Sequence, residues 1–393
     1  MDAKIPDKKN DYFLSQPHQP FFVLAIANAI VAMLIFALAH KGVLSLEIDT
    51  ATFHSYSLIF MVFTNVFIGF LFTTYTRFCQ ASTIGKSYYV KILYANALGS
   101  LLFLAGSFLD YSIALVGMAI LFVAQIFTLL KLRDIYAKGT AANKEDPLWI
   151  LIAQFFGVFS NALFILSALG LNVQNFAVSV GFYAYVVFLT FSVAQRMIPF
   201  FSHSYEQKSD HFIKIVFALF ALKTISSALD FTIAQILVDV LLAAYLLKEF
   251  INWKLPLFGS PAILWVLHLG LFWLPAAFFI SALTEIAGLF ADADFLFIGE
   301  HLLAIGFVTT ILIGFGTRVA LGHSGQSPHA DGIATKIFWF IQAVVVLRAL
   351  YSLNVAFGWG ADFLFDASFS AWLLLFLAWG ARYSKVLIFG SKL

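Results

Sequence analysis

The chain has little charge and a single cysteine. Asp, Glu, Lys and Arg together make up 11% of its 393 residues, whereas hydrophobic residues make up 62%. A soluble domain needs a polar surface around its core, so this composition excludes that class of protein. The one cysteine, Cys79, excludes an internal disulfide bond. The net charge of +2 says nothing about partners, because the basic residues follow the membrane topology. We predict no nucleic-acid partner.

Long hydrophobic runs fill the chain instead. We identify twelve blocks of roughly 20 residues, the length of a helix that crosses about 30 Å of hydrocarbon. They lie near 21–39, 54–76, 88–108, 110–132, 148–169, 174–198, 211–229, 231–251, 262–283, 295–320, 333–356 and 368–389. The blocks predict an all-α polytopic membrane protein in a lipid bilayer. Residues 21–389 would form one transmembrane domain, with tails at 1–20 and 390–393.

Lysine and arginine are nearly absent from every second gap between the blocks. With the N-terminus placed in the cytoplasm, 20 of the 23 Lys and Arg residues fall on the cytoplasmic side. Lys41 is alone on the other side, and Lys223 and Arg348 lie inside blocks. Because cytoplasmic loops carry the excess of Lys and Arg, we predict that both termini are cytoplasmic.

A few polar residues lie inside the blocks, where ionisable groups are costly and usually face a partner, a cavity or a cofactor. Lys223 and Asp239 would form a buried ion pair between neighbouring helices, or would carry protons. Arg348 has no evident carboxylate partner, so it would bind either backbone carbonyl groups or an anionic group such as a haem propionate. The other three such residues are His268, Glu300 and His301.

Two histidines lie at similar predicted depths. With the helix boundaries taken at charged residues, His54 lies about 14 Å and His301 about 8 Å outward of the midpoints of their helices. Two imidazoles at one level on different helices can hold a haem iron between them. His268 is predicted to lie deeper, near the centre of its helix, where a neutral imidazole needs a partner. We predict a peripheral position for the other six histidines: His18, His40, His203, His211, His323 and His329.

A weak internal repeat links three blocks. They end in FLFTTYTR, FLTFSVAQR and ILIGFGTR, at Arg77, Arg196 and Arg318, so the arginines are 119 and 122 residues apart. Three pseudo-symmetric arcs of four helices would satisfy this period. The attraction of arginine to cytoplasmic helix ends would produce the same pattern by chance.

Five segments carry recognisable motifs: HQPFF (18–22), FHSYSLIFMVFTNVFIGFLFTT (53–74), QRMIPFF (195–201), LWVLHLGLFWLP (264–275) and HLLAIGFVTTILIGFGTRVALGHSG (301–325). Taken together and in this order, they resemble the NnrS family of bacterial inner-membrane proteins. That family is associated with nitric oxide metabolism, and its members are described as containing haem and copper. The resemblance therefore implies a multi-pass protein of the bacterial inner membrane that binds haem b, and copper as a second candidate cofactor. Nitric oxide would be its ligand, and its electron donor is unknown.

This chain departs from the family in one motif. Where the family usually has His-x-His-Glu, the chain has His54 followed by Tyr56 and Ser57, which removes a histidine and a carboxylate that could hold copper. A more distant likeness is to subunit I of haem–copper oxidases, which also has twelve helices in three arcs and holds its low-spin haem by histidines in helices 2 and 10. His54 and His301 occupy similar places, while Gly299 stands where those oxidases place their high-spin haem ligand. This second likeness is an analogy of fold.

The resulting hypothesis is an axial His54–His301 pair on haem b near the periplasmic side. Tyr56, Ser57 and Glu300 are candidates to hold the second nitrogen of each ligand. His268 would serve a second, deeper metal or haem site, Arg348 would neutralise a propionate, and Lys223, Asp239 and Glu300 would carry protons. No catalytic residue is assigned. If the protein is an enzyme, it would be an oxidoreductase acting on nitric oxide or nitrosylated iron.

Two other classes of function remain open. One is a twelve-helix secondary transporter with Lys223, Asp239, Glu300 and Arg348 as substrate or proton sites. The other is a structural or sensory membrane subunit that binds haem without turnover.

Overall fold

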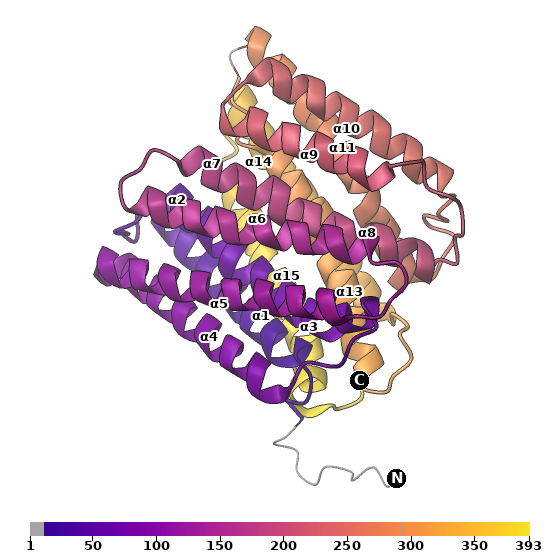
Figure 1. Cartoon of the computed structure of the whole chain (residues 1–393). Coiled ribbons are helices and arrows are strands. Elements are labelled where there is room, and N and C mark those ends of the chain that lie inside the picture. The colour runs from indigo at the N-terminus through magenta and orange to yellow at the C-terminus, as the bar shows by residue number, and fades with distance from the viewer. Residues whose placement is uncertain (1–11, 292) are drawn as a thin grey trace, which may run out of the picture. The chain divides into compact units, whose positions relative to one another are not determined.

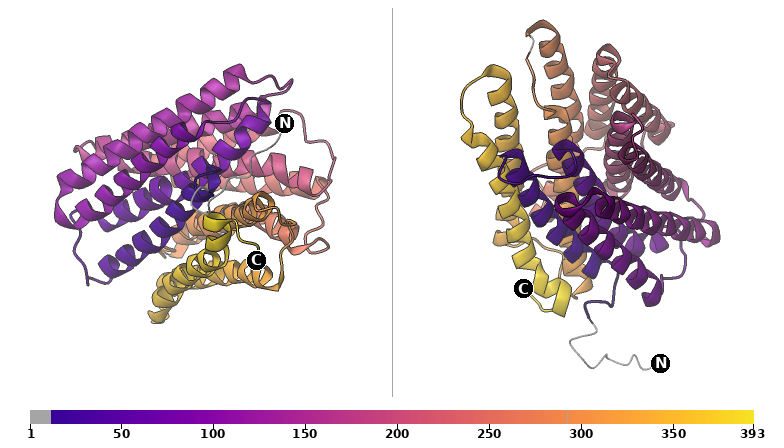
Figure 2. Two further views of the ribbon diagram at one scale, coloured as in Figure 1. Left: turned by 90° about the horizontal axis from the view of Figure 1, so that it is seen from below. Right: turned by 90° about the vertical axis from the view of Figure 1, so that its left-hand side faces the viewer.

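The computed structural model describes residues 12–291 and 293–393, and within these residues the chain is helical without any strand (Figures 1 and 2). The helices are α1 (His18–His40), α2 (Thr50–Tyr56), η1 (Ser57–Phe63), α3 (Thr64–Phe78), α4 (Lys86–Leu109), α5 (Tyr111–Lys138), α6 (Glu145–Ala168), α7 (Gln174–Ser179), η2 (Val180–Val187) and α8 (Phe188–Phe201). They continue with α9 (Phe212–Ala228), α10 (Thr232–Asn252), α11 (Ala262–Ala291), α12 (Ile298–His301), η3 (Leu302–Thr309), α13 (Thr310–His323), α14 (Gly332–Phe357) and α15 (Phe363–Phe389). The η segments are π-helical and join their α neighbours without a break. Each predicted hydrophobic block therefore coincides with one continuous helix.

Ten of the helices found in the described residues are long and apolar enough to cross a membrane. The other two are α9, which has only 17 residues, and α10, which carries Asp239, Lys248 and Glu249 within its 21 residues. The chain is thus a multi-pass membrane protein. The count of twelve spans and the cytoplasmic position of both termini stay predictions, and Lys4, Lys8 and Lys9 lie outside the described residues.

Three helices contain a π-helical segment and are more buried than the rest. The segments begin at Ser57, Val180 and Leu302, so they are 123 and 122 residues apart. Between 83% and 89% of the apolar core of these helices is buried, against 33–61% in the other candidate spans. They are the same three helices that contain Arg77, Arg196 and Arg318. Because π-bulges are frequent at functional sites, we expect a functional site on these three helices. The arrangement of the twelve helices in three arcs stays a prediction.

The chain divides into two compact units. Unit 1 comprises residues 1–147, 316–328 and 376–393, and unit 2 comprises residues 148–315 and 329–375. The boundaries fall inside α6, α13 and α15 and in the loop between α13 and α14. The prediction of a single transmembrane domain stays a prediction.

In unit 1, α4 and α5 lie along one another because glycines remove side chains from the contact (Figure 1). A Cβ at Gly117 would lie 2.4 Å from the backbone nitrogen of Phe103, and one at Gly106 would lie 2.1 Å from that of Ala114. Small residues allow this close approach between membrane helices. Asp110 begins α5 by accepting a hydrogen bond from the backbone N–H of Ser112 at 2.6 Å, and this bond lowers the pKa of the Asp110 carboxyl.

In unit 2, α10 packs against both α9 and α11. Aromatic side chains fill the contacts of α9 with α8 and α11; Phe220, for example, meets Phe278 on α11 edge to face with ring centroids 5.7 Å apart. The polar residues of α9, α10 and α11 therefore face one another inside an apolar surround. The packing of α9, α10 and α11 thus brings together the polar side chains that form the candidate site.

Candidate functional site

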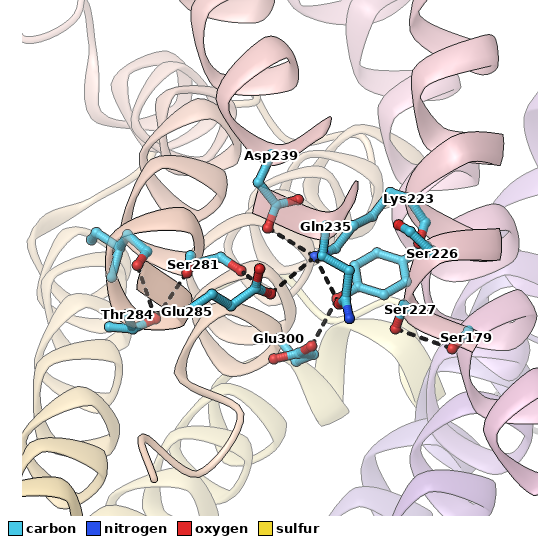
Figure 3. Close-up of polar contacts among 12 residues, drawn as sticks. Ser179, Lys223, Ser226, Ser227, Gln235, Asp239, Ser281, Thr284, Glu285 and Glu300 are labelled. Atoms are coloured by element: carbon cyan, nitrogen blue, oxygen red, sulfur yellow. Dashed lines mark hydrogen bonds and ion pairs between the residues drawn. The ribbon is translucent and has the colours of Figure 1, made fainter. Parts of the chain in front are cut away.

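Lys223 and Asp239 form the centre of a buried charged cluster in unit 2 (Figure 3). The Nζ atom of Lys223 on α9 lies 2.8 Å from Oδ2 of Asp239 on α10, and both side chains are 0% exposed. The ion pair considered from the sequence is therefore present. A buried pair of this kind needs further polar partners to offset the cost of removing two charges from water.

Glu285 and Gln235 supply such partners, and sequence reasoning missed both. Glu285 Oε1 on α11 and Gln235 Oε1 on α10 lie 3.5 Å and 3.4 Å from Lys223 Nζ (Figure 3). Ser281, one turn before Glu285, donates to the same Oε1 at 3.5 Å. The predicted block ended at residue 283, whereas α11 continues to Ala291. An acidic residue within the apolar run SALTEIAGLF was the signal that could have extended it.

A tyrosine connects the cluster to the start of α12. Tyr183, in η2, donates to Glu300 Oε1 at 2.7 Å. The Lys223 ammonium lies 5.3 Å from the centroid of the same tyrosine ring, within the range of a cation–π interaction. Glu300 thus points one carboxylate oxygen toward the ionic cluster, and its predicted role in holding the ring of His301 stays a prediction. No sequence pattern marked Tyr183, because an aromatic residue in an apolar run is ordinary.

Two carboxylate oxygens in the cluster lack hydrogen-bond partners among the described residues. They are Oδ1 of Asp239 and Oε2 of Glu285. Asp239, Glu285 and Glu300 supply three carboxylates, whereas Lys223 and the nearby Arg348 supply two cations. If all five groups were ionised, the cluster would carry one uncompensated negative charge.

The turn before α12 is strained and is held by an arginine. Leu296 and Phe297 have positive φ angles of 43° and 52°, which bulky residues rarely adopt and which cost of order 1–3 kcal/mol each. Arg348 Nη2 donates to the Leu296 carbonyl at 2.9 Å, and its Nη1 donates to Ser352 Oγ at 2.5 Å. Of the two alternatives for Arg348, the contact with a backbone carbonyl is present. The planar guanidinium has five N–H donors, so donors remain for an anion.

His301 lies directly after this turn. Its Nδ1 lies 2.8 Å from the carbonyl oxygen of Phe297 and 3.0 Å from Arg348 Nη2. One nitrogen cannot donate to the carbonyl and accept from the guanidinium at once, so the two contacts belong to alternative tautomers. The tautomer that donates Nδ1–H to Phe297 leaves Nε2 with a lone pair, as a metal-ligating histidine requires.

Gly299 permits the close approach of α12 to α11. A Cβ at this position would lie 2.7 Å from Cβ of Ser281. The space beside Gly299 is therefore filled by Ser281.

His54 lies in unit 1, in the first turns of the helix that Asp49 caps by accepting from the N–H of Thr52 at 2.9 Å. Its ring lies 4.1 Å from that of Phe36, centroid to centroid. Ser57 donates to the backbone carbonyl of His54 at 3.1 Å rather than to its ring. Tyr56 is fully buried, and its hydroxyl lies 3.5 Å from the Met118 carbonyl on α5.

His268 is fully buried but does not lie at mid-helix. It is the seventh residue of α11, close to the loop before that helix and to the end of α8. Its Nε2 lies 2.6 Å from Ser202 Oγ and its Nδ1 3.5 Å from Ser260 Oγ. Glu285 follows 17 residues later, about 25 Å along the helix. The prediction of a central position for His268 was wrong, because α11 extends much farther beyond it than the hydrophobic block indicated.

The peripheral histidines divide into two groups. His40, His203, His211 and His329 are exposed, as predicted. The prediction was wrong for His18, which is 1% exposed, and His323 is half-buried at the end of α13. Their rings meet in unit 1 with centroids 4.4 Å apart.

The described residues contain no group of three or more His, Cys, Asp or Glu side chains that could hold a metal ion. A haem held by two histidines would not form such a group, so this observation bears on a multidentate metal site alone. His54 belongs to unit 1 and His301 to unit 2, and the axial pair stays a prediction.

Comparison with known proteins agrees with the motifs. No curated protein matches the chain. The family model described as NnrS protein matches residues 12–389, which is nearly all of the sequence. The five motifs, the helical membrane fold and this match lead to one conclusion: the chain belongs to the NnrS family.

Proposed function

We propose that this protein binds haem b in the bilayer and handles nitric oxide there, by binding it, reducing it or relieving nitrosative stress. Family membership fits a membrane protein related to nitric oxide. The observation that carries the haem proposal is His301, whose Nδ1 lies 2.8 Å from a backbone carbonyl. That contact would fix the ring and its tautomer, with Nε2 as the atom that would bind the iron.

The residues around His301 fit a haem. Arg348 adds a cation beside the imidazole, and its unused N–H donors suit a propionate. His54 and His301 each lie in the first turns of their own helix. His54 would supply the second axial nitrogen. When bound, the haem would supply reversible electron transfer at its iron, with electrons from a donor that is not identified.

The buried cluster of unit 2 would supply protons for such a reaction. One uncompensated charge in a low-dielectric interior costs several kcal/mol, so we infer that the cluster retains one proton among its three carboxylates. Asp239 and Glu285 each have an oxygen on which that proton could reside. Glu300 is the member closest in sequence to His301, and Tyr183 links it to the rest. A change of charge beside His301 would then alter proton occupancy in the cluster.

His268 does not fit the role of a second metal ligand. Both of its ring nitrogens face serine hydroxyls, and it lies about 25 Å along α11 from Glu285. We therefore leave His268 out of the haem site, and an open coordination position for nitric oxide would require release of His54 or His301. Copper stays a candidate cofactor, to be placed elsewhere.

The test is a spectrum of the protein purified in mild detergent. We expect low-spin b-type bands in the dithionite-reduced minus oxidised spectrum, with haem b quantified as the pyridine haemochrome. His301→Ala and His54→Ala should each abolish those bands, whereas the exposed His203→Ala should keep them. Nitric oxide added to the reduced wild type should shift the bands. An unchanged spectrum in His301→Ala would remove the assignment.

One observation favours a second candidate, a proton-coupled secondary transporter. The Lys223–Asp239–Glu285 cluster resembles the buried ionisable groups that mark ion and proton pathways in membranes. A colourless preparation that added haem does not restore would favour this candidate. Proteoliposomes with an imposed pH gradient would then show solute-dependent proton flux that Asp239→Asn abolishes.

A further inference from the structure

Polar side chains line the contact between α9 and the continuous helix of α7 and η2. Asn175 Nδ2 on α7 donates to Oδ2 of Asp230, two residues after the end of α9, at 2.9 Å. Farther along the same contact, Ser179 Oγ on α7 donates to Ser227 Oγ on α9 at 3.2 Å (Figure 3). We call these four residues, together with Tyr183 in η2, the polar ladder.

The ladder follows the helix period and ends at the buried cluster of unit 2. Asn175, Ser179 and Tyr183 are four residues apart, so they lie on one face of their helix at intervals of about 6 Å along its axis. The Tyr183 hydroxyl donates to Glu300 Oε1 at 2.7 Å. Its ring centroid lies 5.3 Å from the Lys223 ammonium. The last member of the ladder therefore contacts the cluster itself.

Exposure falls steadily along the ladder. Asp230 and Asn175 are exposed and Ser227 is half-buried. Ser179 is 5% exposed and Tyr183 only 2%. The predicted topology places the exposed end on the outer side of the membrane. A polar row that leads from a helix end into an apolar interior is costly to bury, and such rows mark ion and proton pathways in membrane proteins.

We propose that the polar ladder conducts protons from the outer surface to the buried cluster. Asp230 takes a proton from water, and its hydrogen bond with Asn175 holds the carboxylate in place. The hydroxyls of Ser227 and Ser179 relay the proton inward. Because a hydroxyl both donates and accepts, each one accepts a proton and releases its own. One proton moves inward, and no group is oxidised or reduced.

The steps between successive members are longer than a hydrogen bond. An interval of about 6 Å is roughly twice the usual O–H···O distance, so one bridging water completes each step. Tyr183 then passes a proton to Glu300, and the cluster holds it. Oδ1 of Asp239 and Oε2 of Glu285, which lack hydrogen-bond partners among the described residues, are the oxygens that can keep it.

This inference rests on the retained proton of the proposed function, to which it adds a route and the side of entry. It uses no haem ligand. A protein that lacks haem would therefore contradict the haem proposal and leave the ladder testable.

The test follows deuteration of the retained proton by infrared spectroscopy of the full-length protein, without an assay of activity. Transfer into D2O shifts the C=O stretch of a protonated carboxyl group, so the rate of the shift measures proton exchange. Ser179→Ala and Asp230→Asn should each slow exchange at least about 10-fold. Ser227→Thr keeps its hydroxyl and should exchange as the wild type does. The matched control is Ser192→Ala, because Ser192 is 0% exposed and donates within its own helix, to the Phe188 carbonyl at 2.7 Å.

The possible outcomes separate the ladder from the retained proton. The Asp239→Asn/Glu285→Gln variant should lose the carboxyl band, which assigns the band to the cluster. Equal exchange rates in Ser179→Ala, Asp230→Asn and the wild type would overturn the ladder alone, since a merely structural row of hydrogen bonds does not set the rate. A wild type without the band would contradict the retained proton and the ladder with it. Asp230→Asn changes an exposed side chain, so it gives an answer even where Ser179→Ala does not fold.

Discussion

The two units bury different kinds of polar side chain. In unit 1, the buried polar residues that the structure describes are neutral amides, hydroxyls and one imidazole, such as Asn28, Asn65, Gln125 and His18, without a buried Lys, Arg, Asp or Glu. In unit 2, Lys223, Asp239 and Glu249 are all at most 1% exposed. A neutral amide needs one or two hydrogen bonds, whereas a buried charge needs a network. The difference shows that, among the described residues, fully buried charges and the networks that they need are confined to unit 2.

The largest effect is expected when the charge network of unit 2 is broken. Lys223→Met would leave Asp239 and Glu285 without their cation, which should lower the free energy of unfolding by about 3–5 kcal/mol. Titration with SDS in mixed micelles would measure this loss in the free energy of unfolding. Lys254→Met is a matched control, because its pair with Glu206 is exposed on both sides and contributes at most about 1 kcal/mol.

A triple variant sharpens the same point. Lys223→Met combined with Asp239→Asn and Glu285→Gln removes the cation and both carboxylates together, so most of the lost stability should return. Retention of function in this neutral variant would contradict a role of the cluster in proton transfer.

An intermediate effect is expected at Tyr183→Phe. The change removes the hydrogen bond to Glu300, and a bond to a charged group contributes about 1.5–3 kcal/mol. It should also separate Glu300 from the rest of the cluster without changing any charge. The same SDS titration measures the stability, and a loss below about 0.5 kcal/mol would indicate that Glu300 is neutral or differently paired.

The smallest effect is expected in unit 1, at Asn28→Leu. Asn28 Nδ2 donates to the Met61 carbonyl at 2.9 Å and to Ser100 Oγ at 3.1 Å. The Met61 carbonyl keeps a second donor, Asn65 Nδ2 at 2.7 Å. Hydrogen bonds between membrane helices contribute about 0.6 kcal/mol on average, so the loss should be near that value. A loss as large as that of Lys223→Met would erase the contrast between the units.

The helices could be predicted from the sequence, because each hydrophobic block is a physical requirement of a membrane segment. The ion pair between Lys223 and Asp239 followed from two opposite charges at similar depth on neighbouring helices. Glu285 was missed because it lies just beyond a block boundary, where hydropathy no longer distinguishes a helix interior from its end.

The meeting of His18 and His323 could not have been predicted from hydropathy. Both histidines lie just outside the hydrophobic blocks 21–39 and 295–320, where a solvated side chain is the ordinary expectation. The burial of His18 depends on the close approach of α1 to α3 at Gly69, which is a tertiary contact. The position of His268 was misjudged for a related reason, since the length of α11 is set by packing beyond its apolar core.

The central claim is that a haem at His301 is coupled to protons held in the buried cluster of unit 2. The most direct test is a redox titration of the haem between pH 6 and 8, in the wild type and in the Asp239→Asn/Glu285→Gln variant. If reduction is accompanied by uptake of one proton, the midpoint potential of the wild type should fall by up to about 59 mV per pH unit, and the variant should show a much flatter dependence. Equal slopes in the two proteins, or a wild type without haem, would contradict the account.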